Sequence, residues 1–253
     1  MLKIMNKIES ALQRTRDTKA LFIGKGVVAR TAEMFNKLFP GKTAVIIADT
    51  NTWEVAGKAV EASLQEAGVP MAEKLVIDDP ELYAEWRFIE MIEDFLKDRD
   101  VIAIAVGSGV INDLTKLVSG RLGRKYMCVG TAVSMDGYTA YGASITKDGN
   151  KETYDCPAPY GFVMDPEIAA EAPKELAASG YADLIAKIPA AADWMLADAT
   201  GNEKIDDFSW HLVQDGLKEA LSAPAEVHAG DIAYTEKLGE GLLMSGFAMQ
   251  ALL

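Results

Sequence analysis

Several features are scarce in this sequence, and each scarcity narrows the class of protein. Its 253 residues include two cysteines, Cys128 and Cys156, which lack the density of a disulfide framework, so we expect free thiols. No apolar run approaches the about 18 residues that cross a bilayer, which excludes a membrane span. Basic residues are few beside acidic ones, 25 against 38, for a net charge of −13. This balance argues against a nucleic-acid partner, because Lys and Arg carry that affinity.

The N-terminus also lacks a feature of exported proteins. Residues 1–9 alternate charged and apolar side chains and have no continuous apolar segment of the kind a secretory signal needs. A cytoplasmic location is therefore the expectation. Neither an internal repeat nor a low-complexity linker is present, and the length allows one large domain or two modest ones.

The most informative stretch covers residues 101–116. The run from Val101 to Val106 is apolar and largely β-branched, which predicts a strand buried on both faces of a parallel sheet. Gly107 and Gly109 then permit a tight turn, and the helix expected after them would direct free N–H groups toward a pyrophosphate. A plain strand-to-helix connection is the alternative. The Rossmann fingerprint is not matched, because Asn112 stands where its third glycine would be.

Strands and helices alternate through the first half, as in a parallel α/β sheet. The expected strands are 20–23, 43–48, 73–77, 101–106 and 126–129, and the expected helices are 27–38, 52–67, 80–97 and 109–119. Residues 147–150 predict a hairpin turn.

The composition changes after Asp165-Pro166, where alanine dominates and apolar residues recur every three to four positions. We therefore expect two domains, residues 1–164 and 165–253, with helices over 173–197 (bent at Pro189), 206–221 and 232 to the end.

Two further segments follow predicted strands, where ligands bind in open α/β sheets. Asp49 could accept hydrogen bonds from an adenosine ribose, or the segment Thr50 to Thr52 could simply cap the next helix. Residues 131–140 are rich in small hydroxylated side chains, as are loops that line sites.

These motifs together resemble a known family. Gly107-Ser108-Gly109, followed by Asp113 and Lys116, is similar to the Gly-Gly-Gly-x-x-x-Asp-x-x-Lys motif of iron-containing alcohol dehydrogenases, glycerol dehydrogenases and dehydroquinate synthases, with serine as the middle residue. Residues 134–138 (Ser-Met-Asp-Gly-Tyr) and 179–187 resemble the glycerol-1-phosphate dehydrogenase branch. The resemblance implies an N-terminal Rossmann-like α/β domain and an all-α C-terminal domain of the dehydroquinate synthase type, with cofactor, metal and substrate in the cleft between them.

The resemblance also implies roles for individual residues. The pyrophosphate of NAD or NADP would bind Gly107, Ser108, Gly109, Val110 and Ile111, and the nicotinamide half would contact the segment from Thr131 to Ser134. Asp136 would lie beside the substrate. The family often has a cofactor-contacting serine four positions later, but this chain has Ala140, so the resemblance does not extend to that contact.

Asp183 matches the family's metal-ligating aspartate, and the resemblance places it at the substrate as well. On the sequence alone it could instead be a first-turn acid that the helix dipole stabilises. The implied chemistry is a zinc or nickel ion that polarises the ketone of dihydroxyacetone phosphate, with hydride delivered from the nicotinamide.

Two family histidines complete the metal site after the helix that corresponds to residues 239–250, but this chain has only His211 and His228, upstream of it. One aspartate cannot hold a catalytic zinc, which takes three protein ligands. The expectation is therefore a fragment or a natural truncation, with an incomplete C-terminal domain that exposes an apolar face.

The functional expectation is NAD(P)-dependent, metal-dependent reduction of dihydroxyacetone phosphate to sn-glycerol 1-phosphate, with this chain impaired by its missing histidines. The partner would be a small phosphorylated substrate. The alternatives are a glycerol or polyol dehydrogenase of the same fold and a non-catalytic nucleotide-binding remnant. The sequence does not separate NAD from NADP, and it leaves a homo-oligomer open.

Overall fold

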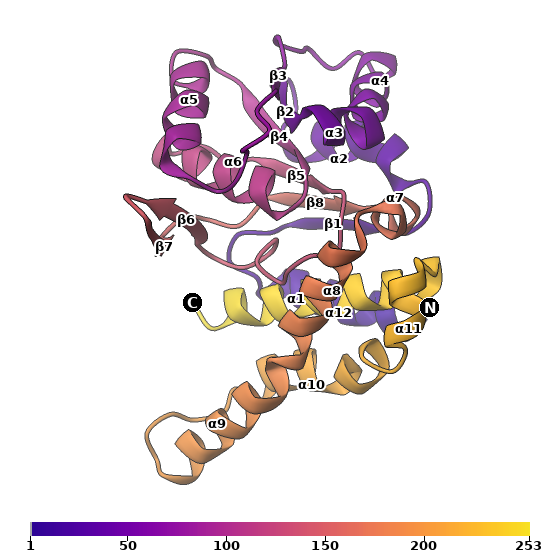
Figure 1. Ribbon diagram of the computed structural model, residues 1–253, viewed down its shortest axis with the longest axis vertical. Helices are drawn as coiled ribbons and strands as arrows, with labels where there is room; N and C mark the ends of the chain where they lie inside the picture. Colours follow the sequence, from indigo (N-terminus) through magenta and orange to yellow (C-terminus); the bar gives the residue numbers. More distant parts are fainter. Residues whose placement is uncertain (1) are drawn as a thin grey trace.

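The computed structural model describes residues 2–253, with side chains described from Lys7 onward. Within these residues, six parallel strands form one sheet in the order β1-β8-β5-β4-β2-β3 (Figure 1). Their bounds are β1 Ala20–Ile23, β2 Ala44–Asp49, β3 Leu75–Ile77, β4 Ile102–Gly107, β5 Met127–Gly130 and β8 Gly161–Met164. The parallel pairing confirms the α/β class that the alternation predicts.

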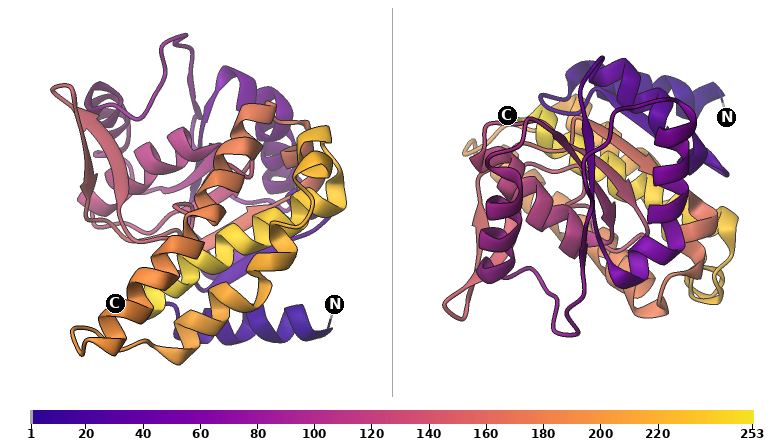
Figure 2. Two further views of the ribbon diagram at one scale, coloured as in Figure 1. Left: turned by 60° about the horizontal axis from the view of Figure 1, so that its bottom comes forward. Right: turned by 90° about the horizontal axis from the view of Figure 1, so that it is seen from above.

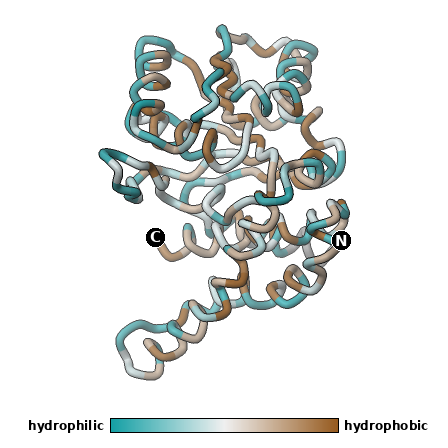
Figure 3. The backbone as a smooth tube through the Cα atoms, viewed as in Figure 1, coloured by the Kyte–Doolittle hydropathy of each residue, from teal (hydrophilic) through white to brown (hydrophobic). Residues whose placement is uncertain are grey.

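Both faces of the sheet are covered by helices. In β2, Val45 and Ile47 join the core formed with α5 (Trp86–Leu96) and α6 (Gly109–Arg121), whereas Ile46 and Ala48 join the core formed with α2 (Thr31–Leu38) and α4 (Lys58–Glu66). Figure 3 shows hydrophobic strands between more hydrophilic outer helices. The apolar run of β4 is likewise buried on both faces, as predicted.

Several elements differ in detail from the sequence expectation. A 3-10 turn, η1 (Val27–Arg30), precedes α2, and α3 (Thr50–Thr52) and a π turn, η2 (Trp53–Gly57), precede α4. α5 begins at Trp86 rather than near Pro80, because Oδ1 of Asp79 accepts the Glu81 N–H at 2.9 Å and holds a turn there. The predicted hairpin is confirmed as β6 (Ala143–Lys147) and β7 (Asn150–Tyr154).

The remainder of the chain is helical. Its helices are α7 Pro166–Glu171, α8 Lys174–Ile185, α9 Lys187–Ala199, α10 Asp207–Ala220, α11 Pro224–Ala229 and α12 Ile232–Ala251. The helix expected over 173–197 divides at Ala186, because Pro189 has no N–H to offer the Ile185 carbonyl four residues earlier. The short α11 was not expected.

The N-terminal helix α1 (Leu2–Arg14), also not expected, packs against α12 on the helical side of the molecule (Figure 2). Helix α9 projects from the body and exposes Ile188, Met195 and Leu196, at 55%, 56% and 64% of their surfaces. The apolar face expected of an incomplete helical domain stays a prediction. The division at residue 164 stays a prediction. Among residues 2–253, no helix combines the length and apolar character that crossing a membrane requires.

Candidate active site

The carboxyl ends of three neighbouring strands, β2, β4 and β5, lie side by side. Ala48 of β2 pairs with Val106 of β4, and Gly107 pairs with Gly130 of β5. After β2 the chain forms α4 on one face, and after β4 it forms α6 on the other. Where the connections of two adjacent strands go to opposite faces of an open α/β sheet, a crevice that binds ligands forms at the carboxyl ends of those strands. Asp49 and the turn 107–109 lie at its two sides.

The turn 107–109 packs closely against Ile111 and Met135. A Cβ atom on Gly107 would lie 2.6 Å from Cβ of Ile111, and one on Gly109 would lie 2.9 Å from Sδ of Met135. Ser108 is the N-cap of α6, but its side chain accepts no hydrogen bond from the described residues of the first turn. The N–H groups of this helix end are therefore free to bind an anion, which the helix dipole favours.

Two predicted cofactor contacts on α6 differ in what they can offer. Ile111 is fully buried under Gly107, so only its backbone can serve a ligand. Val110 is half-buried. A pyrophosphate at the N-terminal turn of α6 would therefore be bound by backbone N–H groups.

Asp49 caps the helix after β2. Its Oδ1 accepts the N–H groups of Asn51 at 2.8 Å and Thr52 at 2.9 Å, and Oγ1 of Thr52 accepts the Asp49 N–H at 3.1 Å. The capping residue is therefore Asp49 itself, and Thr52 completes the reciprocal box. Oδ2 of Asp49 accepts no hydrogen bond from the described residues, so its predicted role at a ribose stays a prediction.

Residues 131–142, called the site loop below, pack on the turn 107–109. The Thr131 N–H donates to the Gly107 carbonyl at 3.1 Å. The Met135 side chain lies between Gly109 and Gly137, where any added Cβ atom would crowd its sulfur. Oγ of Ser134 is 3.1 Å from the Tyr138 hydroxyl, so this predicted cofactor contact is engaged within the loop.

Lys116 of α6 holds the site loop in place. Its side chain is fully buried, and Nζ donates to the carbonyl oxygens of Gly137 at 2.6 Å, Ala140 at 3.0 Å and Gly142 at 3.1 Å. Asp113 is 3.9 Å away, and burial raises the pKa of this carboxyl despite the Lys116 charge. Lys116 therefore ties the helix that begins at Gly109 to the loop that carries Asp136.

Asp183 on α8 meets the same loop from the helical half. Its Oδ2 accepts the Asp136 N–H at 2.7 Å. Oδ2 of Asp136 in turn accepts the Ser245 hydroxyl at 2.8 Å and lies 2.5 Å from the Lys187 ammonium. Asp183 stands in the last turn of α8, so the alternative of a first-turn acid is wrong. The Asp136 carboxylate thus binds the ammonium and the hydroxyl, and the Asp183 carboxylate binds the Asp136 backbone.

The surroundings raise the pKa of Asp183 above its ordinary value. Burial raises the pKa of this carboxyl, and the negative charge of Asp136 raises it further, whereas the Asp136 N–H and Lys187 act in the opposite direction. A carboxyl of this kind is frequent at functional sites.

Small residues let the two halves approach closely. A Cβ atom on Gly180 of α8 would overlap the Val133 carbonyl oxygen, and one on Gly246 of α12 would overlap Oγ1 of Thr139. The glycines therefore set the contact that brings Asp183 and Ser245 to the site loop.

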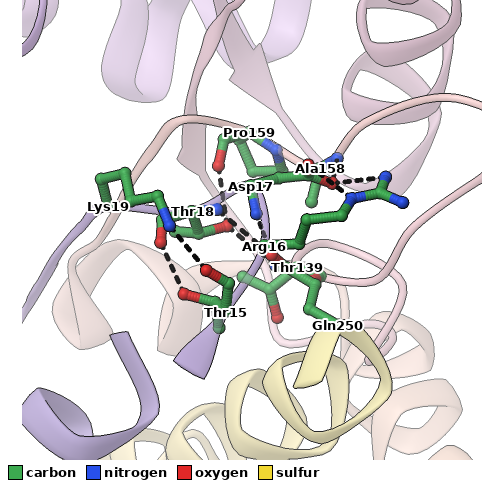
Figure 4. A network of polar contacts seen from close by, with 9 residues as sticks. All are labelled: Thr15, Arg16, Asp17, Thr18, Lys19, Thr139, Ala158, Pro159 and Gln250. Carbon is green, nitrogen blue, oxygen red and sulfur yellow. Dashed lines mark hydrogen bonds and ion pairs between the residues drawn. The ribbon is translucent and has the colours of Figure 1, made fainter. Parts of the chain in front are cut away.

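Gln250, near the end of α12, also anchors the site loop (Figure 4). Its Oε1 accepts the N–H groups of Asp17 at 2.9 Å and Thr18 at 3.1 Å, and its Nε2 donates to the Thr139 carbonyl at 2.6 Å. The loop is thus held by α6 on one side and by α8 and α12 on the other.

A divalent metal does not find a full ligand set here. Among the described residues, no three His, Cys, Asp or Glu side chains gather closely enough to hold an ion. Asp183 receives an N–H, and Asp136 is paired with Lys187. His211 is exposed on α10 beside Asp215, and His228 is exposed on α11. The residues present offer at most part of a metal site.

The structure therefore brings together most of the residues that the sequence singled out. Gly109, Asp136 and Asp183 form one continuous line of contacts through Met135. Sequence reasoning missed Ser245 and Gln250 and did not assign Lys116 or Lys187 a contact. Lys187 lies four residues after Asp183, a spacing that would place both on one face of an unbroken helix, but α8 ends at Ile185 and Lys187 begins α9.

A family model for iron-containing alcohol dehydrogenases matches residues 22–173, which is more than half of the chain. The chain belongs to the iron-containing alcohol dehydrogenase family. The site loop, both strand ends of the crevice and α6 all lie within the matched residues.

Solved structures of this family share the fold. Glycerol dehydrogenase from Schizosaccharomyces pombe superposes with a TM-score of 0.74 at 20% identity, covering 92% of this chain and 61% of that protein. An iron-containing alcohol dehydrogenase from Thermotoga maritima gives 0.70 at 13% identity, covering 93% and 68%. These likenesses confirm the Rossmann-like α/β part with a helical C-terminal part.

Curated relatives are more similar in sequence. Proteins named glycerol-1-phosphate dehydrogenase (NAD(P)+) from Bacillus subtilis and Bacillus velezensis are 33% and 32% identical over 216 and 212 residues, each covering 82% of this chain. One from Pyrococcus furiosus is 29% identical over 232 residues. The chain spans about half the length of the Bacillus relatives, 53% in each case.

Proposed function

We propose that this chain binds NAD or NADP in the crevice between β2 and β4. The diphosphate would lie on the turn 107–109 and the free N–H groups of α6, with the nicotinamide half beside Thr131 and Ser134. Two observations support this assignment: a turn in which a Cβ atom on Gly107 would lie 2.6 Å from the Cβ atom of Ile111, and a 13-residue helix whose first turn has no side-chain cap among the described residues. A free carboxylate oxygen of Asp49 would accept the ribose hydroxyls.

We further propose that the protein acts as a glycerol-1-phosphate dehydrogenase, reducing dihydroxyacetone phosphate to sn-glycerol 1-phosphate. The observation that carries this proposal is the bond from the Asp136 N–H to Asp183, next to the Met135 contact with Gly109. Asp136 directly follows the residue that contacts the proposed nucleotide turn, and Asp183 binds the backbone of Asp136. The names of the Bacillus and Pyrococcus relatives supply the substrate class.

The chain's own residues would orient the substrate. A bound nicotinamide supplies the hydride. Asp136, fixed by Lys187 and Ser245, would accept hydrogen bonds from a substrate hydroxyl, and Asp183 would lie beside the reacting oxygen. Asp183 is also the proposed ligand of zinc or nickel, but the described residues complete no metal site, so no step of the reaction is assigned to a metal.

A fluorescence titration with NADH and NADPH tests nucleotide binding. We expect saturable binding that Ser108→Asp weakens by at least about tenfold, because a carboxylate at the helix end repels the diphosphate. The matched control is Ser222→Asp, which changes an exposed serine directly after α10 in the helical half. Binding of equal strength by the wild type and Ser108→Asp would contradict the proposal.

The absence of a full ligand set among the described residues favours one second candidate, a nucleotide-binding module without turnover. An assay of NADH oxidation with dihydroxyacetone phosphate and added zinc or nickel separates the two. Turnover supports the dehydrogenase, and binding without turnover supports the module. If glycerol is oxidised instead and inorganic phosphate does not compete, the activity is that of a polyol dehydrogenase.

A further inference from the structure

A second concave surface lies at the amino ends of the strands, whereas the crevice lies at their carboxyl ends. It has a volume of about 360 Å³ and lies beside the start of β1, the end of α6 and the residues before β8. Four basic side chains line it, together with one acidic side chain and two tyrosines: Arg16, Lys19, Arg124, Lys125, Asp17, Tyr126 and Tyr160. We call it the basic pocket.

Three of its four positive charges have no acidic partner. Asp17 neutralises Arg16 at 3.0 Å and also accepts the Ala158 N–H at 3.0 Å (Figure 4). Among the described residues, no carboxylate lies within ion-pair distance of Lys19, Arg124 or Lys125. In a chain with a net charge of −13, such a concentration of uncompensated positive charge is unusual.

Neutral groups hold these cations in place. Nζ of Lys19 donates to the Thr15 carbonyl at 2.6 Å, and the Arg124 guanidinium donates to two carbonyls at the end of α5 at 2.9 and 3.1 Å. The Lys125 ammonium lies 3.7 Å from the centre of the Tyr160 ring. Carbonyls and rings orient a cation without cancelling its charge, and the nearby ends of α5 and α6 offset only about half a charge each.

We propose that the basic pocket is a second ligand site, which binds a small phosphate-bearing anion of about the size of a diphosphate. Its concave shape and volume suit a small molecule rather than a flat macromolecular surface. Ordered cations around a concavity also raise the local concentration of anions. The site does not depend on the proposed dehydrogenase activity, because it lies at the other edge of the sheet from Gly109.

Calorimetric titration with inorganic pyrophosphate at low ionic strength tests the proposal. Because pyrophosphate can also bind the turn 107–109, the titration is run on Ser108→Asp as well as on the wild type. We expect one anion per chain in the basic pocket, and the double variant Lys19→Gln with Lys125→Gln should lower the affinity of this site at least about tenfold. Lys58→Gln, on the far helix α4, should leave the affinity unchanged, because that lysine is paired with Glu54 at 2.6 Å. Circular dichroism checks that all variants fold alike.

A further variant distinguishes the basic pocket from the proposed nucleotide site. Ser108→Asp should keep the pyrophosphate bound in the basic pocket, because it changes only the crevice. Loss of binding in Ser108→Asp would place the anion on the turn 107–109 and overturn the proposal. So would unchanged binding in the double lysine variant, or no binding by the wild type at about 10 mM pyrophosphate.

Discussion

The backbone nitrogen of Asp136 lies 2.7 Å from Oδ2 of Asp183, which joins the loop after β5 to the last turn of α8. Met135, one residue before Asp136, rests on Gly109. The turn at the end of β4 and the carboxylate of the helical half are therefore linked through two consecutive residues. A substitution at Gly109 should therefore affect the position of Asp183, and a substitution at Asp183 should affect the turn at Gly109.

Replacement of Asp183 tests the link directly. Asp183→Ala removes the acceptor of a partly buried N–H, so we expect the free energy of unfolding to fall by about 1–3 kcal/mol. Asp183→Asn keeps an acceptor oxygen and should lose less. Urea unfolding followed by circular dichroism measures both, with the exposed Asp193→Ala on α9 as the control. Equal midpoints for Asp183→Ala and the wild type would show that the bond contributes nothing.

Lys116 should prove essential for the site loop. Lys116→Met keeps the length of the side chain but leaves three carbonyl oxygens without their donor in a buried place. We expect the free energy of unfolding to fall by about 3–5 kcal/mol, as when one partner of a buried charged group is removed. NADH binding should weaken as well, because the loop that packs on Gly109 loses its anchor.

The control for this variant is Lys58→Met, whose exposed ammonium is paired only with Glu54. It should leave both the unfolding midpoint and NADH binding nearly unchanged. If Lys116→Met unfolds at the same urea concentration as Lys58→Met, the carbonyl contacts of Lys116 carry little energy.

The strand-turn-helix unit around Gly107 could be predicted because its signals are local. An apolar run, two glycines and a following helix lie within sixteen residues, and a parallel sheet orders the strand ends along one edge. The position of Asp183 relative to Gly109 followed only from the family resemblance. No local pattern in an alanine-rich helix indicates which of its side chains contacts the site loop.

The contacts of Lys116 and Gln250 could not be predicted from the sequence for a different reason. A lysine in a helix usually projects into water, and only the packed site loop turns this one inward. Gln250 bonds with Thr18, which precedes it by 232 residues. Likewise, α5 starts late because the side chain of Asp79 competes with the helix for a backbone N–H.

Glu240 on α12 should make stability depend on pH. Burial raises the pKa of this carboxyl, and the charges of Glu236 and Glu219 raise it further, against Lys7. The folded state therefore binds this proton more tightly than the unfolded chain does, whose pKa is about 4.3. The free energy of unfolding then falls as the pH rises from that value through the raised pKa.

Glu240→Gln should therefore be more stable than the wild type at pH 7, and the difference should shrink on acidification and vanish near pH 4. Thermal unfolding at half-unit steps between pH 4 and 8 measures it. Glu66→Gln, an exposed acid at the end of α4, controls for the loss of one negative charge. A stabilisation that is equal at pH 4 and pH 7 would exclude the titration of Glu240 as its cause.

Two helical glycines offer a matched test of how closely the halves approach. A Cβ atom at Gly180 would overlap the Val133 carbonyl oxygen, whereas one at Gly216 of α10 would meet nothing nearer than Nζ of Lys7 at 3.6 Å. Gly216→Ala should raise the free energy of unfolding by about 0.5–1 kcal/mol, because alanine favours the helix.

Gly180→Ala gains the same helix propensity but must push α8 away from the site loop. We expect it to lower the free energy of unfolding by about 1–3 kcal/mol and to weaken activity, since Asp183 moves with α8. Urea unfolding of the pair decides the matter: if both alanines stabilise the protein alike, α8 and the site loop are not in the close contact that places Asp183 against Asp136.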